Sequence, residues 1–466
     1  MDGAAGPSLQ ESARTLRQKP SYRTRDTSPM KPIPKAALSG SLKDYRALKN
    51  SGLMARAENF FSWQDLRRQH GLWPYARSTS SAPRPRSDIR TDAGEASSGV
   101  NFASQDYLSL SSHPRIKAAA RDAIDAYGVH SAGSAALLGN TAYSLQLSQA
   151  LSEFVGGREV VLYPTGWAAG YGAIQGFVRA DDHVVMDLLA HSCLQAGASA
   201  ATGNVHYFRH LDQNALVRKL ANIRATDTQN GILVATESLF SMHSETPDLR
   251  ALRNICDAYG ASLLVDCAHD FGCMSEDGLG HIGAQEMLGD IDIVIGSFSK
   301  TFASNGGFVA VKTRAAAEYL RYYSAPHTFS NALSPVQAAT IMEALAIIRS
   351  DEGKELRRKL RDNVIHLRQA MARSGREVLG EPSPIVPVRV GGEGLGRLAS
   401  KYLSLYGGIA NLVEFPAVPL GQSRFRFQVM AAHSADDIET MVAVFNRAMD
   451  SAATELEQIQ RETDTC

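Results

Sequence analysis

The segment that decides the fold is residues 291–301, with the sequence IDIVIGSFSKT. Residues 291–295 have the short apolar pattern of a buried β-strand, and the strand passes into a loop that contains Lys300. Small hydroxyl residues on either side of this lysine can bind an anion. A partly desolvated lysine also has the lowered pKa that imine chemistry requires. Lys300 is therefore the first candidate for a chemical role.

A second predicted strand, residues 261–266 (ASLLVD), ends in Asp266 and is followed at once by Cys267, Ala268 and His269. In open α/β sheets, ligands bind at the carboxyl ends of the strands, so Asp266 and Lys300 are expected to face one site. A lysine that forms a Schiff base and an acid that pairs with a pyridinium nitrogen together indicate pyridoxal phosphate (PLP). Each residue alone has an ordinary alternative: a loop lysine is commonly solvated, and an aspartate at a strand end commonly forms a turn or a helix cap.

Helix and strand patterns alternate through the middle of the chain, which predicts an α/β fold with a mostly parallel sheet covered by helices on both faces. Helices are expected over residues 114–127 and 142–154, each closed by glycine. Strands are expected at residues 160–163, 183–186, 205–208, 232–236, 263–266, 291–295 and 307–311. A single long helix is predicted from Pro335 to about residue 374. It leads into a smaller α+β domain with strands at residues 386–390 and 424–429.

The composition outside this region predicts further parts of the chain. The first residues are rich in Ser, Pro, Lys and Arg without an apolar core, which excludes a secretory signal and favours a disordered tail. An organellar transit peptide fits the basic bias, but five prolines argue against the amphipathic helix that it needs. The predicted parts are a tail (1–40), a helical arm with a Ser/Pro/Arg linker from residue 78 (41–98), a large PLP-binding domain (99–334) and a small domain (335–466).

The balance of charged residues excludes several classes of protein. Lys plus Arg and Asp plus Glu both number 48, so no overall basic field favours nucleic acid. No run of 18 apolar residues occurs, and no membrane span is expected. The five cysteines lack CxxC spacing, which suits free thiols in the cytoplasm, and Cys267 and Cys273 beside His269 are insufficient for a metal site.

The strand-end motifs resemble those of a known family. Asp266-x-Ala268-His269 and residues 296–300 (GSFSK) are similar to the Asp-Glu-Ala-His and Gly-Thr-x-x-Lys signatures of the α-oxoamine synthases. Further landmarks of the family are matched by residues 101–108 (NFASQDYL), 163–169 (YPTGWAA), 187–192 (DLLAHS) and 236–242 (TESLFSM). Residues 415–419 (FPAVP) and 423–427 (SRFRF) most resemble serine palmitoyltransferases. The resemblance implies the aspartate aminotransferase-like fold of PLP enzymes of fold type I.

The resemblance also implies roles for the candidate catalytic residues. Lys300 would bind PLP and transfer the proton at the substrate Cα, and Asp266 would keep the pyridinium nitrogen protonated. His269 would hydrogen-bond to the phenolic oxygen of the cofactor, and His191 would stack on its ring. The other expected cofactor-binding residues are Gly166, Trp167 and Ser297 around the phosphate, Glu237 and Ser241 in the pocket, and Ser330 from a partner subunit.

The implied activity is a decarboxylative Claisen condensation of a small α-amino acid, such as serine, alanine or glycine, with an acyl thioester of coenzyme A or an acyl carrier protein. Arg426 would bind the amino-acid carboxylate, and a homodimer with shared active sites is expected. Glu414 and Ser144 depart from relatives, and we expect both in the acyl pocket, where Glu414 would repel a dicarboxylic chain. The alternatives are a PLP-dependent aminotransferase or aldolase, or a non-catalytic partner subunit.

Overall fold

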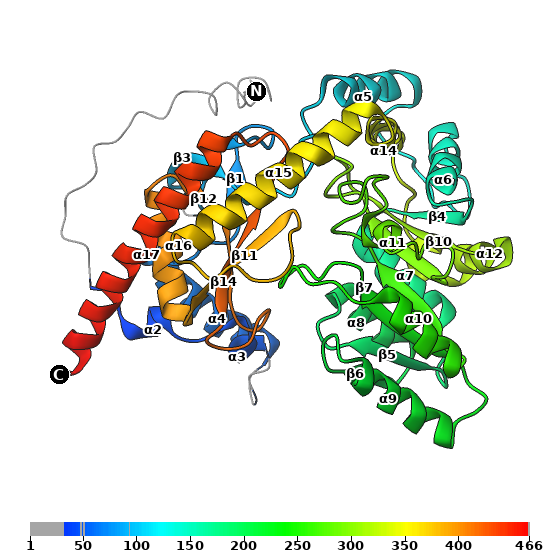
Figure 1. Cartoon of the computed structure of the whole chain (residues 1–466), viewed down its shortest axis with the longest axis horizontal. Coiled ribbons are helices and arrows are strands. Elements are labelled where there is room, and N and C mark those ends of the chain that lie inside the picture. Colours follow the sequence, from blue (N-terminus) through cyan, green and yellow to red (C-terminus); the bar gives the residue numbers. More distant parts are fainter. Residues whose placement is uncertain (1–31, 47–48, 50–51, 93, 465–466) are drawn as a thin grey trace, which may run out of the picture.

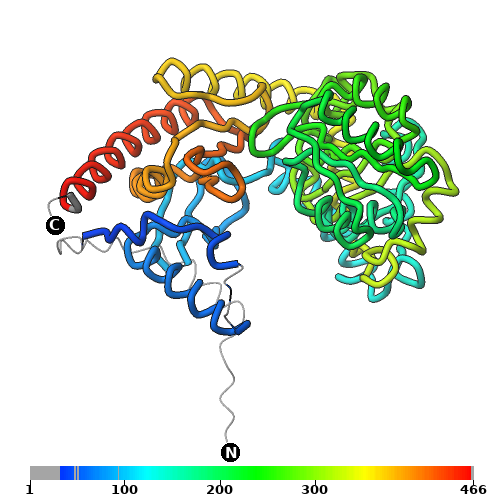
Figure 2. The backbone as a smooth tube through the Cα atoms, turned by 90° about the horizontal axis from the view of Figure 1, so that it is seen from below, coloured from blue at the N-terminus to red at the C-terminus, as the bar shows by residue number. Residues whose placement is uncertain are grey.

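The computed structural model describes residues 32–46, 49, 52–92 and 94–464. Two lobes lie side by side, a large one that contains the middle of the chain and a small one (Figures 1 and 2). The small lobe combines segments before residue 102 with segments after residue 377. The long helix α15 (Asp351–Arg373) runs from the large lobe to the small one.

The large lobe is built on a seven-stranded sheet with the order β4-β10-β9-β8-β7-β5-β6. Its neighbours are parallel except β10, which is antiparallel to both β4 and β9. The mostly parallel sheet predicted from the sequence is confirmed. The strands are β4 (Glu159–Tyr163), β5 (His183–Asp187), β6 (Val205–Phe208), β7 (Ile232–Glu237), β8 (Ser262–Asp266), β9 (Ile293–Ser297) and β10 (Gly307–Val311).

Helices cover both faces of this sheet because both faces are apolar. Along β9, Ile293 and Ile295 belong to the cluster on one face, whereas Val294 belongs to the cluster on the other. The first cluster contains apolar residues of α7 (Gly166–Phe177), α8 (Ser192–Ala201) and α12 (Arg314–Tyr323). The second contains residues of α5 (Pro114–Tyr127), α6 (Ala142–Phe154), α9 (Gln213–Thr226), α10 (Leu249–Ala258) and α14 (Pro335–Ile348). Two short helices complete the lobe, α11 (Gly280–Ala284) and α13 (Ala325–Thr328).

The single helix predicted from Pro335 to about residue 374 is wrong, because the segment forms two helices, α14 and α15. The break lies at Arg349 and Ser350. The Ser350 side chain accepts a hydrogen bond from the backbone N–H of Gly353 and so caps the start of α15. Gly353 allows this turn, since a Cβ there would lie 2.3 Å from the carbonyl oxygen of Ile347.

The small lobe contains two sheets. One joins β1 (Ser78–Thr79), β2 (Arg86–Arg90), β3 (Ala96–Asn101) and β12 (Gly408–Ile409), and the other joins β11 (Ile385–Gly391), β14 (Ser423–Gln428) and β13 (Asn411–Val413). The surrounding helices are α2 (Lys35–Leu38), α3 (Leu42–Arg46), α4 (Leu53–Gln69), α16 (Glu393–Leu405) and α17 (Ala435–Asp464).

Two predictions about the N-terminal part need correction. The Ser/Pro/Arg segment from residue 78 is not a linker: Ser87 and Ile89 alternate with exposed residues along β2, as expected for a strand with one buried face. The predicted tail also ends too late, because Ile33 and Ala37 are buried in the small lobe. Residues 1–31 of that tail lie outside the described residues.

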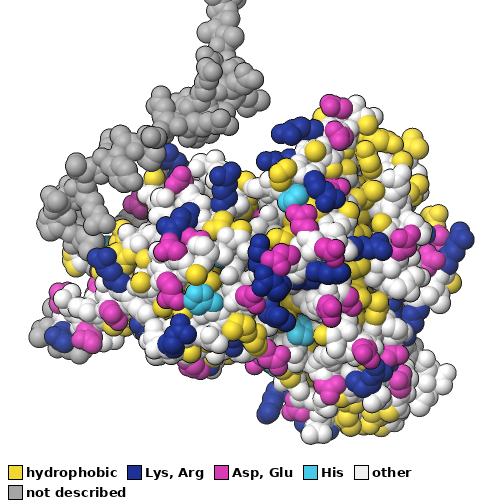
Figure 3. Space-filling model, turned by 45° about the horizontal axis from the view of Figure 1, so that its top comes forward, with side chains coloured by type: hydrophobic (Ala, Val, Ile, Leu, Met, Phe, Trp, Pro, Cys, Tyr) yellow, Lys and Arg dark blue, Asp and Glu magenta, His cyan; other side chains and the backbone are white. Residues whose placement is uncertain are grey.

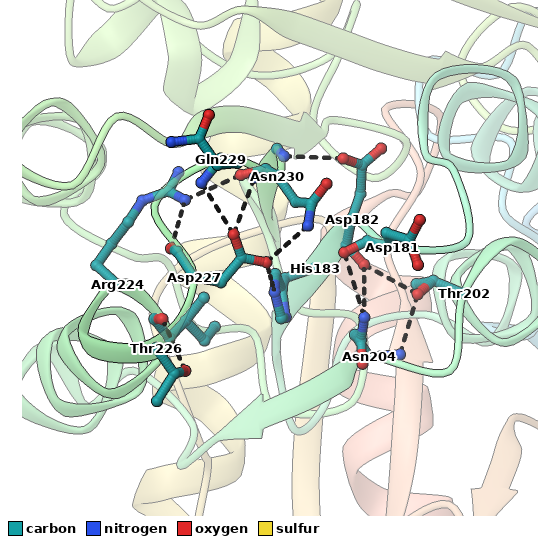
Figure 4. A network of polar contacts seen from close by, with 12 residues as sticks. Asp181, Asp182, His183, Thr202, Asn204, Arg224, Thr226, Asp227, Gln229 and Asn230 are labelled. Carbon is teal, nitrogen blue, oxygen red and sulfur yellow. Dashed lines mark hydrogen bonds and ion pairs between the residues drawn. The ribbon is translucent and has the colours of Figure 1, made fainter.

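At the amino ends of the strands, polar side chains fasten the loops of the large lobe (Figure 4). His183 Nε2 lies 3.0 Å from Asp227 Oδ2, and Asp182 accepts a hydrogen bond from the backbone N–H of Gly231 at 2.8 Å. Over the face drawn in Figure 3, basic and acidic side chains are intermingled, in keeping with their equal numbers. Among the described helices, none is both long and apolar enough to cross a bilayer.

Candidate active site

A cavity of about 280 Å³ lies where β7, β8 and β9 end and α7 begins. This is the carboxyl edge of the parallel strands, where ligands of open α/β sheets bind. The structure brings eight of the predicted site residues into its wall: Gly166, Trp167, His191, Glu237, Asp266, His269, Ser297 and Lys300. Residues far apart in the sequence, such as Glu237 and Lys300, thus share one surface.

Two carboxyl groups stand side by side at the ends of neighbouring strands. Glu237 on β7 is the register partner of Asp266 on β8, and both are buried. Burial and the nearby Asp266 raise the pKa of Glu237 well above its usual range. Burial also raises the pKa of Asp266, but His191, the N–H of Ala268 and Lys300 oppose that rise. Asp266 is therefore the member of the pair better placed to carry the negative charge.

Lys300 lies in the loop after β9, and aromatic packing fixes this loop. The ring centroids of Phe298 and Phe302 are 5.3 Å apart, and that of Phe298 lies 5.5 Å from the ring of Phe308 on β10. Burial lowers the pKa of Lys300, while the negative charge of Asp266 opposes this shift. A lysine with a lowered pKa is more readily deprotonated and can act as a nucleophile.

The two histidines of the cavity are both neutral near pH 7, because burial lowers the pKa of each. His191 is the N-cap of α8, and its Nδ1 accepts the backbone N–H of Cys193 at 3.3 Å. His269 has its Nδ1 3.0 Å from the hydroxyl of Tyr107. In each ring, Nδ1 forms a hydrogen bond within the protein, so Nε2 is left for a ligand.

An anion site is formed at the start of α7. The side chain of Thr165 accepts the N–H of Ala168 at 3.0 Å, so the earlier amides of Gly166 and Trp167 are left for a ligand. Gly166 must be glycine here, because a Cβ would lie 2.4 Å from the side chain of Ser297. The hydroxyl of Ser297 adds a further polar group beside these amides.

Comparisons with known proteins agree with this geometry. The model of the aminotransferase class I and II family matches residues 97–445. The serine palmitoyltransferase of Sphingobacterium spiritivorum is 30% identical over 403 residues, 86% of this chain and 98% of that protein. The chain is an α-oxoamine synthase. The synthases of this family are PLP-dependent acyltransferases, and the cavity fits PLP, with a lysine, a buried carboxylate and an anion site in its wall.

Two further relatives extend the comparison of this α-oxoamine synthase. The 4-hydroxy-2,2'-bipyrrole-5-methanol synthase PigH of Serratia sp. is 27% identical over 87% of this chain, and the chain spans 61% of the length of PigH. The structure of serine palmitoyltransferase from Sphingomonas wittichii superposes with a TM-score of 0.80 and 25% identity, covering 87% of this chain and all of that one.

Three predicted site residues of this synthase lie outside the cavity wall. Arg426 on β14 donates to the carbonyl oxygen of Ser241 at 3.3 Å, so the small lobe contacts the large lobe beside the site. Its positive charge contributes to the lowered pKa values of Lys300 and His269. The hydroxyl of Ser330 donates to the carbonyl oxygen of Pro326 in the same chain.

Sequence reasoning missed several residues of the wall, including Thr165, Cys193, Asn305 and Gly306. Thr165 carried a usable signal, because a threonine before a helical pattern is a typical N-cap. Asn305 and Gly306 precede β10, whose antiparallel return to the sheet brings them beside Lys300. That pairing is not visible in the local pattern.

The expectation for Glu414 is wrong, whereas that for Ser144 stays a prediction. Glu414 is buried and forms ion pairs with Arg67 at 3.3 Å and Arg397 at 2.8 Å. It also accepts a hydrogen bond from the hydroxyl of Tyr75 at 3.0 Å. Its charge is therefore balanced within the small lobe and is not offered to an acyl chain. Ser144 is part of the capping box of α6 and is absent from the cavity wall.

A second cavity, of about 290 Å³, lies at the opposite edge of the sheet beside Asp182 and His183. The amino ends of parallel strands are not where α/β enzymes place their chemistry, and we assign no role to it. Within the described part of the chain, no group of three or more His, Cys, Asp or Glu side chains is arranged to hold a metal ion.

Proposed function

We propose that this α-oxoamine synthase condenses a small α-amino acid with an acyl thioester in the manner of serine palmitoyltransferase. The new C–C bond forms between the amino-acid Cα and the thioester carbonyl, and an α-amino ketone, CO2 and a free thiol are released. The observation that carries the proposal is the single cavity in which Lys300, Asp266, His269 and His191 meet. Serine, alanine and glycine are the proposed amino acids.

In this proposal PLP supplies the electron sink for the negative charge that develops at Cα. Lys300, with its lowered pKa, binds the cofactor and then transfers the proton at Cα. The carboxylate of Asp266 holds a proton on the pyridine nitrogen, and His269 donates a hydrogen bond to the phenolic oxygen. His191 covers the ring, while Gly166, Trp167 and Ser297 hold the phosphate. Glu237 completes the wall, and Ser241 lies beside it, where its carbonyl oxygen accepts a hydrogen bond from Arg426.

We assign the amino-acid carboxylate to Arg426. Its positive charge contributes to the lowered pKa values of Lys300, His191 and His269, and a planar guanidinium suits a planar anion. Its position on β14 means that the small lobe supplies the substrate contact while the large lobe supplies the cofactor contacts.

We also propose a homodimer whose partner subunit supplies Ser330 to the cofactor phosphate. Two adjacent loops expose an apolar surface: Leu137, Leu138 and Phe329 are 86–90% exposed. Ser134 and Asn331 form a bridge between these loops, and the N–H of Ala332 donates to the carbonyl oxygen of Gly133. Large apolar side chains exposed together commonly mark an interface. The proposed compartment is the cytoplasm, and the thioester carrier is coenzyme A or an acyl carrier protein.

Release of CO2 from carboxyl-labelled serine, alanine and glycine tests the function. Each amino acid is supplied with no thioester, with medium-chain and long-chain acyl thioesters of either carrier, and with a dicarboxylic acyl thioester. We expect thioester-dependent CO2 release with at least one small amino acid and a product whose mass equals that of the α-amino ketone. Exchange with keto acids at a comparable rate without thioester would instead indicate an aminotransferase, and aldehyde release from a β-hydroxy amino acid would indicate an aldolase.

A further inference from the structure

A buried chain of hydrogen bonds connects Arg426 to His269 through Gln428 and Tyr107. The last two side chains are fully buried. The amide oxygen of Gln428 accepts from Arg426 Nε at 2.9 Å and Nη2 at 3.2 Å, and its NH2 group lies 3.2 Å from the hydroxyl of Tyr107. The same hydroxyl lies 3.0 Å from Nδ1 of His269. These hydrogen bonds connect the two lobes, from β14 to the loop after β8.

Arginine sets the direction of this chain because a guanidinium can only donate hydrogen bonds. The opposite amide orientation would point the NH2 group of Gln428 at Arg426, so that donors would face donors. With the oxygen facing Arg426, Gln428 donates to the hydroxyl of Tyr107. The hydroxyl proton of Tyr107 is then free to point toward His269.

Nδ1 of His269 accepts the hydrogen bond from this hydroxyl. Nδ1 must therefore carry no proton of its own. Burial, with help from the charges of Lys300 and Arg426, lowers the pKa of His269 well below its usual value, so the ring is neutral near pH 7. A neutral imidazole has one N–H, and here it must be Nε2–H. The ring is thereby a donor on its other side.

We propose that Tyr107 and Gln428 are positioning residues that hold His269 in the tautomer with its proton on Nε2, and that Arg426 fixes the direction of the chain. The inference rests on the proposed function, in which His269 donates to the phenolic oxygen of the cofactor. The inference also connects substrate binding with cofactor binding. Arg426, which we assign to the amino-acid carboxylate, also orients His269, which we assign to the phenolic oxygen of the cofactor.

The decisive variant is Gln428→Glu, which keeps the shape of the side chain but replaces the NH2 donor by an acceptor. The carboxylate remains paired with Arg426, and Tyr107 must now donate to residue 428. The Nδ1 of His269 then donates to Tyr107, and the ring proton moves from Nε2 to Nδ1. In Tyr107→Phe, Nδ1 loses its partner and the tautomer is no longer fixed.

The measurement is the pair of ring 15N chemical shifts of His269 in the holoenzyme, assigned by their loss in His269→Asn. We expect a protonated Nε2 in the wild type, a protonated Nδ1 in Gln428→Glu and a mixture in Tyr107→Phe. The control is Tyr163→Phe, which removes another buried hydroxyl hydrogen bond, to Ser324 at 2.9 Å, away from His269. It should leave both shifts unchanged.

Turnover provides the second readout. We expect kcat to fall roughly tenfold or more in Gln428→Glu and in Tyr107→Phe, as for the loss of one buried hydrogen bond. The effect on kcat should be larger than the effect on the KM of the thioester. A proton that stays on Nε2 in Gln428→Glu would overturn the inference. A wild type with the expected tautomer but without thioester-dependent CO2 release would refute the proposed function alone.

Discussion

At the scale of single residues, the neighbouring carboxyl groups of Glu237 and Asp266 make different predictions for two similar substitutions. Because burial and the nearby Asp266 raise the pKa of Glu237 well above its usual range, its neutral form is favoured, and Glu237→Gln keeps a neutral group of the same shape. Asp266→Asn removes the charge that we assign to the cofactor nitrogen. We expect Asp266→Asn to lose most turnover and Glu237→Gln to lose less than about threefold, or under 1 kcal/mol.

Steady-state turnover of both variants, with bound PLP quantified, checks this assignment. If Glu237→Gln lost as much turnover as Asp266→Asn with cofactor still bound, Glu237 would be the charged member of the pair. If both remained near wild type, neither carboxyl group would serve the cofactor.

Lys300 gives a second prediction at this scale. Lys300→Ala should abolish the covalent link to PLP, because this lysine is the one in the cavity wall. The matched control is Lys312→Ala, since Lys312 follows β10 at the opposite edge of the sheet and pairs with Asp292 at 2.9 Å. The visible absorbance of bound PLP and the mass of the protein after borohydride reduction report the link. A reduced adduct in Lys300→Ala would reassign the lysine.

The role of a residue was predictable from the sequence where it depends on neighbouring residues. It was not predictable where it depends on partners far away in the sequence. Asp266 ends a strand and Lys300 follows one, and this pattern already placed both at the carboxyl edge. Glu414 was misread because Arg67, which balances its charge, lies 347 positions away. Tyr107 was recognised as part of a motif without a role, since its partner His269 lies 162 positions further on.

At the scale of elements, a buried ion-pair cluster fastens α4 to the rest of the small lobe. Glu414 lies between Arg67 of α4 and Arg397 of α16, and both guanidinium groups are fully buried. Glu414→Gln should lower the free energy of unfolding by about 3–5 kcal/mol, because it leaves two buried positive charges without a counter-charge.

Urea unfolding at pH 7 measures this loss, and Glu355→Gln provides the control. Glu355 pairs with Arg358 on the exposed surface of α15, where such a pair contributes about 0–1 kcal/mol. Equal effects of the two substitutions would mean that the cluster around Glu414 is solvated and that α4 is held by apolar packing alone.

His433 fastens the segment after β14 to β3 and gives the small lobe a pH dependence. Its Nδ1 accepts the N–H of Met430 and its Nε2 donates to the carbonyl oxygen of Asn101, both at 2.9 Å. Burial lowers the pKa of His433 to about 4. The ordinary value is about 6.5, so protonation favours the unfolded chain. The stabilisation is complete above about pH 6.5 and is lost as the pH falls toward 4.

Between pH 7 and pH 4 we expect this group to cost on the order of 3 kcal/mol of stability. The measurement compares urea unfolding of the wild type and His433→Gln at both pH values, with His366→Gln as the control on the exposed face of α15. The wild type should lose more stability than His433→Gln. Equal pH dependence in these two proteins would contradict the lowered pKa.

Among the elements, the strands of the large sheet were predictable because both faces are apolar and the patterns are short and uninterrupted. The strands β2 and β3 were not, since their exposed positions carry Arg, Ser and Asp and resemble a linker. Their place in the small lobe depends on the parallel pairing of β3 with β12, more than 300 residues later. The break between α14 and α15 depended on one capping serine within a continuous helical pattern.

At the scale of the whole molecule, the proposed homodimer predicts that Leu137→Glu combined with Phe329→Glu lowers the mass in solution from about twice 50.3 kDa toward 50.3 kDa. Charges in an apolar interface are strongly unfavourable. Sedimentation velocity measures the mass, and Leu420→Glu, an equally polar change at an exposed position of the small lobe, is the control. A monomeric wild type with full activity would refute shared active sites.

The joining of segments before residue 102 and after residue 377 in one lobe has a consequence for synthesis on the ribosome. All seven strands of the large sheet have been made by residue 311, so this sheet can form while the chain is still being translated. The segments from β1 to β3 cannot complete their packing until β12, β14 and α17 have been made, some 300 residues later. At about 5–20 residues per second, that interval lasts on the order of tens of seconds. The surface of the early segments that β12 and its neighbours later cover is exposed to chaperones during this time, and Arg426 reaches the active site last.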